Sequence, residues 1–103
     1  MGQYVKVGTT AELEDLKGGK LIEAAGQSIA LFNVGGTYYA IENTCTHRGG
    51  PLSQGMLSDS VVVCPWHGAR FDVKTGAVLG PPAPVGVKSF PVRVSGGDVE
   101  IEI

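Results

Sequence analysis

The chain has 103 residues, enough for one domain with a modest core. Its formal net charge of −2 gives none of the basic excess that binds nucleic acid, and no apolar run approaches the roughly 18 residues of a membrane span. The first residues lack the charged and then apolar pattern of a secretory signal, so we expect a cytoplasmic protein without a membrane anchor.

The first half of the chain predicts short strands and one helix. Thr9-Thr10 can cap a short helix over 11–16, in which Leu13 and Leu16 lie on one face. Three β-rich runs follow, separated by two-residue turns that contain glycine, and this pattern predicts an antiparallel meander. The strands expected in this half are 3–7, 20–25, 28–34 and 37–42.

The second half predicts further short strands around a small β subdomain over 45–79, inserted into a larger one. The proline-rich segment 80–84 cannot form a regular strand. The whole chain therefore predicts an all-β protein, a single domain over 1–103 built as an antiparallel β-sandwich with the inserted subdomain and one short helix. The strands expected in this half are 55–57, 61–63, 71–73, 77–79, 86–94 and 99–103.

All the cysteines and histidines of the chain lie in two short segments. Cys45-Thr46-His47 supplies one thiolate and one imidazole, Cys64-Pro65-Trp66-His67 supplies the other pair, and sixteen residues separate the two segments. Scattered residues rarely sort in this way, so the pattern predicts a metal site. With both cysteines assigned to metal, none is left for a disulfide, which is typical of a reducing compartment.

Two kinds of metal centre use this donor set. A single zinc ion would be held tetrahedrally, whereas a [2Fe-2S] cluster would take both thiolates on one iron and both imidazoles on the other. Zinc modules usually pair like ligands with like, but here each segment is mixed, as C-x-H and then C-x2-H. The mixed spacing favours the two-iron cluster, gripped by two loops that each supply one Cys and one His.

In their local context the two motifs resemble the Rieske [2Fe-2S] family. Segments 45–52 and 64–72 match its ligand spacing and its glycines and prolines, while Thr75-Gly76 and the Gly80-Pro81-Pro82 turn extend the likeness over essentially the whole chain. The resemblance implies one [2Fe-2S] cluster per chain, covered on one side by the proline-rich loop. The ligands that it implies are Cys45, His47, Cys64 and His67.

Four positions depart from the high-potential members of this family. Those members carry two further cysteines that bridge the cluster loops, where this chain has Gly50 and Trp66, and two hydroxyl side chains, where it has Ala69 and Phe71. Hydroxyl groups that donate to the sulfurs stabilise the negative charge added on reduction and raise the potential. Their absence predicts a reduction potential near the low end of the Rieske range, roughly −150 mV and not roughly +300 mV.

Trp66, Arg48 and Arg70 lie close in sequence to the predicted histidine ligands, and each allows two interpretations. Trp66 can pack and shield the cluster from water, or it can join neighbouring prolines in an apolar docking patch. The two arginines can steer an acidic partner surface, or they can simply pair with nearby carboxylates.

The resemblance implies a one-electron carrier and not an enzyme, similar to the ferredoxin components of aromatic-ring-hydroxylating dioxygenase systems. The partners it implies are a flavin-dependent ferredoxin reductase and a terminal Rieske oxygenase, and we expect a monomer. An oxygenase would need a mononuclear iron held by two histidines and a carboxylate, and no histidine is left over. Two alternatives stay open: a small Rieske subunit of a larger reductase, such as a nitrite reductase, and a zinc-stabilised binding module.

Overall fold

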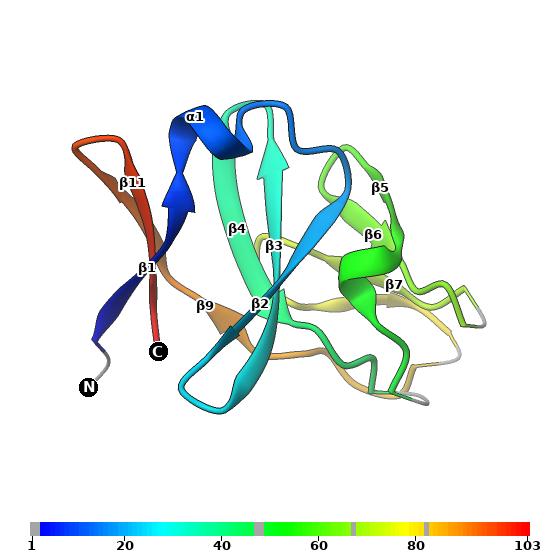
Figure 1. Ribbon diagram of the computed structural model, residues 1–103. Coiled ribbons are helices and arrows are strands. Elements are labelled where there is room, and N and C mark those ends of the chain that lie inside the picture. Colours follow the sequence, from blue (N-terminus) through cyan, green and yellow to red (C-terminus); the bar gives the residue numbers. More distant parts are fainter. Residues whose placement is uncertain (1–2, 47–48, 67, 82) are drawn as a thin grey trace.

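The computed structural model describes residues 3–46, 49–66, 68–81 and 83–103 and arranges their strands in three antiparallel sheets (Figure 1). Among these residues, no helix has the length and apolar character that crossing a membrane requires. The elements are β1 (Tyr4–Thr9), α1 (Thr10–Leu13), β2 (Gly19–Ala24), β3 (Gln27–Val34), β4 (Thr37–Glu42), η1 (Leu52–Gln54), β5 (Met56–Ser58), β6 (Val61–Val63), β7 (Arg70–Asp72), β8 (Val78–Gly80), β9 (Ser89–Phe90), β10 (Val92–Ser95) and β11 (Asp98–Glu102).

The central sheet, in the order β2-β3-β4-β9, contains the predicted meander. Ala25 and Gly26 join β2 to β3 with φ angles of 52° and 74°, and Gly35 and Gly36 join β3 to β4 with φ angles of 60° and 93°. Two consecutive positive φ angles are the mark of type I′ turns, whose twist matches that of the strands on either side. The meander is therefore confirmed.

Strand β3 is buried on both faces, so the central sheet is the middle layer of the molecule. Ile29, Ala30, Leu31 and Phe32 are all fully buried, which is how a strand covered on both sides differs from one with a solvent face. Alternate residues enter two different cores. The base core contains Leu13, Ile22, Ile29, Leu31, Tyr38, Ala40, Phe90, Val99 and Ile101. The loop-side core contains Ala30, Phe32, Ile41, Cys45, Leu52, Val62, Cys64, Ala69, Phe71, Val73, Ala83 and Val87.

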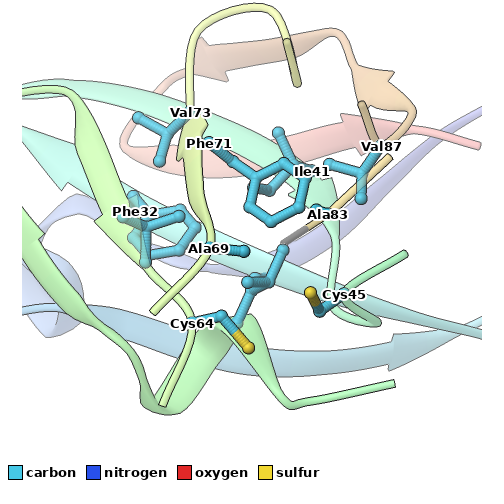
Figure 2. Close-up of a cluster of buried hydrophobic side chains, with 12 residues drawn as sticks. Phe32, Ile41, Cys45, Cys64, Ala69, Phe71, Val73, Ala83 and Val87 are labelled. Atoms are coloured by element: carbon cyan, nitrogen blue, oxygen red, sulfur yellow. The ribbon is translucent and has the colours of Figure 1, made fainter. Parts of the chain in front are cut away.

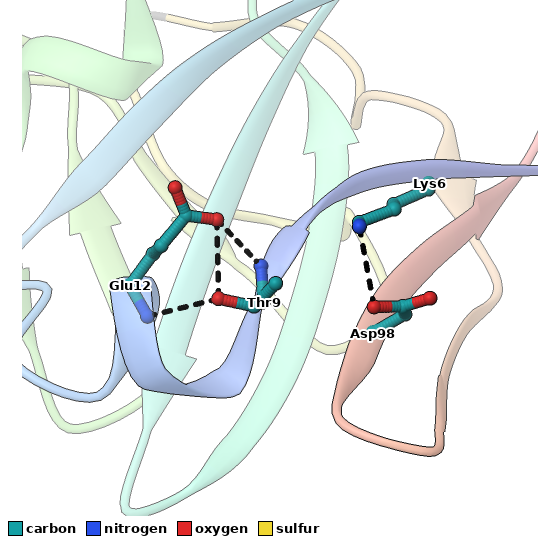
Figure 3. Close-up of polar contacts among 4 residues, drawn as sticks. All are labelled: Lys6, Thr9, Glu12 and Asp98. Atoms are coloured by element: carbon teal, nitrogen blue, oxygen red, sulfur yellow. Dashed lines mark hydrogen bonds and ion pairs between the residues drawn. The ribbon is translucent and has the colours of Figure 1, made fainter.

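The three-stranded sheet, in the order β1-β11-β10, supplies strand residues to the base core, and α1 also packs there. Thr9 and Glu12 form a capping box at the start of α1, as Figure 3 shows. The predicted helix over 11–16 was too long, because α1 ends at Leu13. The Leu13 carbonyl accepts from the Leu16 N–H at 3.1 Å, which tightens the chain into a turn after the helix, and also from the Asn33 side-chain amide at 3.0 Å.

The predicted strand over 86–94 was wrong, because the structure divides it at Pro91. β9 pairs with β4 in the central sheet, whereas β10 pairs with β11 in the three-stranded sheet. Proline lacks the backbone N–H that a continuous ladder needs, so it suits the point where the chain passes from one sheet to the other.

The four-stranded sheet in the order β5-β6-β7-β8 lies on the other side of the central sheet, toward the right of Figure 1. The paired residues Leu57, Val62, Phe71 and Val78 form one row across it. Val62 and Phe71 belong to the loop-side core, and Leu57 and Val78 pack against that core. The sheet therefore holds the second ligand segment, between β6 and β7, against the loop-side core.

Candidate metal centre

The two cysteines come from different elements and enter the same core. Cys45 follows β4 after two residues, and Cys64 directly follows β6. Each is 3% exposed, both are free thiols, and both belong to the loop-side core. Figure 2 shows their side chains at one end of that core, beyond Phe71 and Ala69. The structure thus brings together the two predicted sulfur ligands, although eighteen residues separate them in the sequence.

The loops that carry the cysteines share one backbone pattern. The Cys45 N–H donates to the Gly50 carbonyl at 2.9 Å, and the Gly49 N–H donates to the Cys45 carbonyl at 2.8 Å. In the second loop the Cys64 N–H donates to the Ala69 carbonyl at 2.7 Å, and the Gly68 N–H donates to the Cys64 carbonyl at 3.2 Å. Each loop therefore turns back five residues after its cysteine.

Both turns place a glycine in the left-handed region, with φ of +75° at Gly49 and +80° at Gly68. Residues with a Cβ adopt such angles at a cost, which explains glycine at the fourth position after each cysteine. In the sequence, His47 is the second residue after Cys45 and His67 is the third after Cys64. His47, Arg48, His67 and Pro82 lie outside the residues that the structure describes.

Gly50 is the contact between the two loops. A Cβ placed there would lie 2.6 Å from the Cys64 Sγ atom and 3.1 Å from the Trp66 Cβ atom. Positions 50 and 66 therefore face each other, and these are the positions at which the resemblance to high-potential Rieske proteins implies a bridging disulfide. Here Trp66 packs over a bare glycine backbone instead.

The proline-rich loop, taken here as residues 80–85, is hydrogen-bonded to the first cysteine loop. The Thr46 hydroxyl donates to the Val85 carbonyl at 2.6 Å, and Ala83 is buried in the loop-side core with both cysteines. This loop therefore forms a third wall beside the two thiols. The covering role that the family resemblance implies for this loop stays a prediction.

Asn43 is a structural residue of the site that sequence reasoning missed. Its backbone carbonyl accepts from the Leu52 N–H at 2.7 Å, and its Oδ1 atom accepts from the Ser53 N–H at 2.8 Å. These two bonds close the base of the first loop against η1. Nothing in the local sequence marks this role, because the partners are nine and ten residues further on and η1 itself was not predicted.

The electrostatics of the thiol pair suit a cationic centre. Burial raises the pKa of the Cys64 thiol most, a backbone hydrogen bond from Trp66 lowers it, and the neighbouring Cys45 raises it further. Two thiolates side by side in an apolar core need a positive charge between them, and metal binding displaces their protons. The donor set therefore fits an iron–sulfur centre, and the fold brings the two predicted sulfur ligands, Cys45 and Cys64, into one core.

Comparison with known proteins identifies the family. The model of the Rieske [2Fe-2S] domain matches residues 3–91. The ferredoxin subunit of the 3-phenylpropionate/cinnamic acid dioxygenase of Escherichia coli strain K12 is 47% identical over 76 residues, which cover 73% of this chain and 72% of that protein. The corresponding subunit of Shigella flexneri serotype 5b is equally similar, at 47% identity over the same shares.

Solved structures agree with this result. The ferredoxin of carbazole 1,9a-dioxygenase from Nocardioides aromaticivorans IC177 superposes with a TM-score of 0.87 at 31% identity, covering 96% of both chains. A chain in the complex of reduced oxygenase and oxidised ferredoxin of carbazole 1,9a-dioxygenase gives a TM-score of 0.89 at 33% identity, covering 96% of this chain and 92% of that one. The predicted all-β Rieske fold and the [2Fe-2S] cofactor are thereby confirmed, and the chain belongs to the Rieske [2Fe-2S] domain family.

Proposed function

We propose that this protein is a one-electron carrier that passes electrons from a flavin-dependent reductase to a terminal Rieske oxygenase. The observation that carries the proposal is the pair of buried free thiols on two equivalent loops, in a chain that matches a dioxygenase ferredoxin over 96% of both lengths. Relatives of this chain are likewise ferredoxin subunits of dioxygenase systems. The protein therefore acts as a ferredoxin and is not itself a catalyst.

We propose Cys45, Cys64, His47 and His67 as the cluster ligands, with both cysteines on one iron and both histidines on the other. When bound, the [2Fe-2S] cluster supplies a centre that accepts and releases one electron. The chain's own residues fix its surroundings: glycines 49 and 68 form the turns, and Thr46 holds the proline-rich loop against the first of them. Residues 45–79 form the inserted cluster-binding part of a single domain.

The Rieske part of an oxygenase is also similar to this chain. The apo dicamba monooxygenase chain superposes at a TM-score of 0.83 and 27% identity, over 96% of this chain and 32% of that one. Both histidines of this sequence are proposed as cluster ligands. The alternatives of a zinc-stabilised module and of a small nitrite reductase subunit gain no support from a specific observation.

The partners and the compartment follow from the same proposal. One of the matched structures is a complex between a reduced oxygenase and an oxidised ferredoxin, which supports an oxygenase as the electron acceptor. A flavin-dependent reductase would be the donor. We further propose that the protein works as a monomer in the cytoplasm, where both cysteines stay reduced until they bind iron.

Voltammetry of the purified, iron-loaded protein tests this function. We expect a reversible one-electron wave near the low end of the Rieske range, roughly −150 mV, together with about two irons and two acid-labile sulfides per chain. Alanine at any of the four proposed ligands should abolish the wave, and Ser58→Ala on β5, an exposed position, should leave it unchanged. A fully metallated protein without a wave would instead indicate zinc and a structural role.

A further inference from the structure

The chain contains two asparagines, and the side chain of each holds a backbone N–H group. The Asn33 Oδ1 atom accepts from the Gly36 N–H at 2.9 Å, in the turn between β3 and β4. The Asn43 Oδ1 atom accepts from the Ser53 N–H at 2.8 Å. Asn33 therefore acts within one hairpin, whereas Asn43 joins the two ends of the first cysteine loop, residues 44–51.

Asn43 caps η1 from outside that helix. The first N–H groups of a helix have no partner within it, and in η1 these belong to Leu52 and Ser53. Pro51, which precedes η1, provides no side-chain cap. The Asn43 carbonyl accepts from the Leu52 N–H at 2.7 Å, and the Asn43 side chain accepts from the Ser53 N–H. Both residues of η1 are buried, so an N–H group left there without a partner would be poorly hydrated and unfavourable.

Both groups that Asn43 contacts are fixed to the central sheet. The Asn43 N–H donates to the carbonyl of Ser28, on β3, at 3.0 Å. A Cβ added to Gly19, at the start of β2, would lie 2.8 Å from the Ser53 Cα and carbonyl oxygen atoms, so η1 lies directly against this sheet. Leu52 is also part of the loop-side core. Asn43 therefore closes the base of the loop between two parts of the fold that are held firmly.

The end of the loop that Asn43 holds is also the end that meets the second cysteine loop. Gly50 lies two residues before η1, and its carbonyl accepts from the Cys45 N–H at 2.9 Å. A Cβ added to Gly50 would lie 2.6 Å from the Cys64 Sγ atom. Gly50 therefore touches both cysteines. If η1 separated from Asn43, Gly50 would move with η1 and the fit between the two cysteine loops would change.

We propose that Asn43 is a positioning residue whose side chain keeps the first cysteine loop closed and so controls how long the protein retains its iron. This inference rests on the proposed function, because it takes Cys45 and Cys64 as cluster ligands. Without the Oδ1 acceptor, the base of the loop opens between residues 43 and 53 while the sheets stay folded. Local opening of this kind costs less than global unfolding, and it exposes the iron to a chelator.

The rate at which EDTA removes iron from the loaded protein, measured by the loss of visible absorbance, tests this proposal. The variants are Asn43→Ala and the matched control Asn33→Ala. Asn33 is also half-buried, and its amide donates to the Leu13 carbonyl, so the control should lose at least as much global stability in urea. We expect Asn43→Ala to speed iron release about five- to a hundredfold, the effect of one unpaired buried N–H group. Asn33→Ala should change it by less than about twofold.

Two further variants separate positioning from a general loss of stability. Asn43→Asp keeps an oxygen at the same reach and should restore slow release, whereas Asn43→Gln, one methylene longer, should not. These polar variants decide the question even if Asn43→Ala does not fold.

Equal acceleration by the two alanine variants would mean that iron leaves through global unfolding, and no acceleration by Asn43→Ala would mean that the loop stays closed without this side chain. Either result would overturn the proposal for Asn43. A wild-type protein that holds no iron–sulfur cluster would contradict the proposed function itself, and this is seen in its iron and sulfide content before any rate is measured.

Discussion

Gly50 is a single residue at which the two cysteine loops depend on each other. Alanine there would place a methyl group 2.6 Å from the Cys64 Sγ atom and 3.1 Å from the Cβ and Cγ atoms of Trp66. We expect Gly50→Ala to displace Cys64, to lower the iron content sharply and to cost about 1–3 kcal/mol of stability through overpacking. Iron and sulfide analysis of the purified variant measures the first effect, and urea unfolding measures the second.

The matched control for this substitution is Gly8→Ala. Its added methyl group would approach the Leu13 Cδ1 atom most closely, at 3.1 Å, and this atom is the end of a flexible side chain. This variant should keep its iron. If Gly50→Ala also kept full iron content, the loops would have to be able to separate, contrary to the close approach of Gly50 to Cys64.

Ala69 and Phe71 test the argument for a low potential. Both are fully or almost fully buried in the same core as the two cysteines, so a hydroxyl at either position would lie in their apolar surroundings. Ala69→Ser should raise the reduction potential, because a donor to the sulfurs stabilises the reduced state. Voltammetry measures the shift. Ala40→Ser, at a buried alanine of the base core, should leave the potential unchanged.

The two cysteines of the candidate site could be predicted from the sequence. The residues that hold its loops in place could not. Cys45 and Cys64 were predicted because two equal sets of ligand residues at short spacing are rare by chance. Asn43 was missed because its role depends on where η1 lies after folding. Gly50 was recognised only as a position without a bridging cysteine, since its contact with Trp66 is a product of two loops that meet in space.

At the scale of the elements, Gly76 shows how closely one turn approaches its neighbour. It has a φ of +81°, and a Cβ added there would overlap the Val87 carbonyl. The Val87 N–H also donates to the Gly76 carbonyl, at 2.8 Å. Gly97 has a similar φ of +88° but nothing within 4 Å of the added atom. A side chain at either glycine would therefore have the same unfavourable backbone angle, but only at Gly76 would it also overlap a neighbouring segment.

We expect Gly97→Ala to cost about 1–2 kcal/mol, the penalty for a side chain in the left-handed region. Gly76→Ala should cost about 1–3 kcal/mol more, because it adds overpacking to the same penalty. Urea unfolding of both variants provides the comparison. Equal losses would show that the turn can move away from the 86–88 segment without cost.

The elements that were predicted well are those whose ends are determined by neighbouring residues in the sequence. The turns at 25–26 and 35–36 contain glycine between alternating residues, and their strands were located within one residue. The end of α1 and the break at Pro91 depend on distant partners, Asn33 in one case and the strands β4 and β11 in the other. Pro91 is visible in the sequence, but the sequence does not show that the chain passes from one sheet to another at this residue.

At the scale of the whole molecule, the loop-side core connects the metal centre to the central sheet. Cys45 and Cys64 share this core with Phe32 of β3 and Ile41 of β4. Because the same packing holds both, loss of the cluster should weaken the entire fold and not only the loops. A ligand bound at a thousand times its dissociation constant contributes about 4 kcal/mol, so we expect a loss at least that large.

Urea unfolding of the protein before and after chelation of its iron checks this expectation. Trp66 is the only tryptophan, so its fluorescence reports on the loops, while far-ultraviolet circular dichroism reports on the sheets. In the iron-free protein both signals should change in one coincident transition at a lower urea concentration. An earlier change in fluorescence alone would show that the loops unfold separately from the central sheet.

The two ends of the described chain form a hydrogen-bonded pair. The Gln3 N–H donates to the Ile103 carbonyl at 3.1 Å, and the Ile103 N–H donates to the Gln3 carbonyl at 2.9 Å. Figure 1 places the start of β1 and the end of β11 at the end of the molecule opposite β5 to β7. The fold can therefore be inserted into a loop of another protein, or circularly permuted, with the joining point far from the thiols. An electron-transfer module with adjacent ends is suited to fusion with a catalytic domain, and its redox end would still face outward.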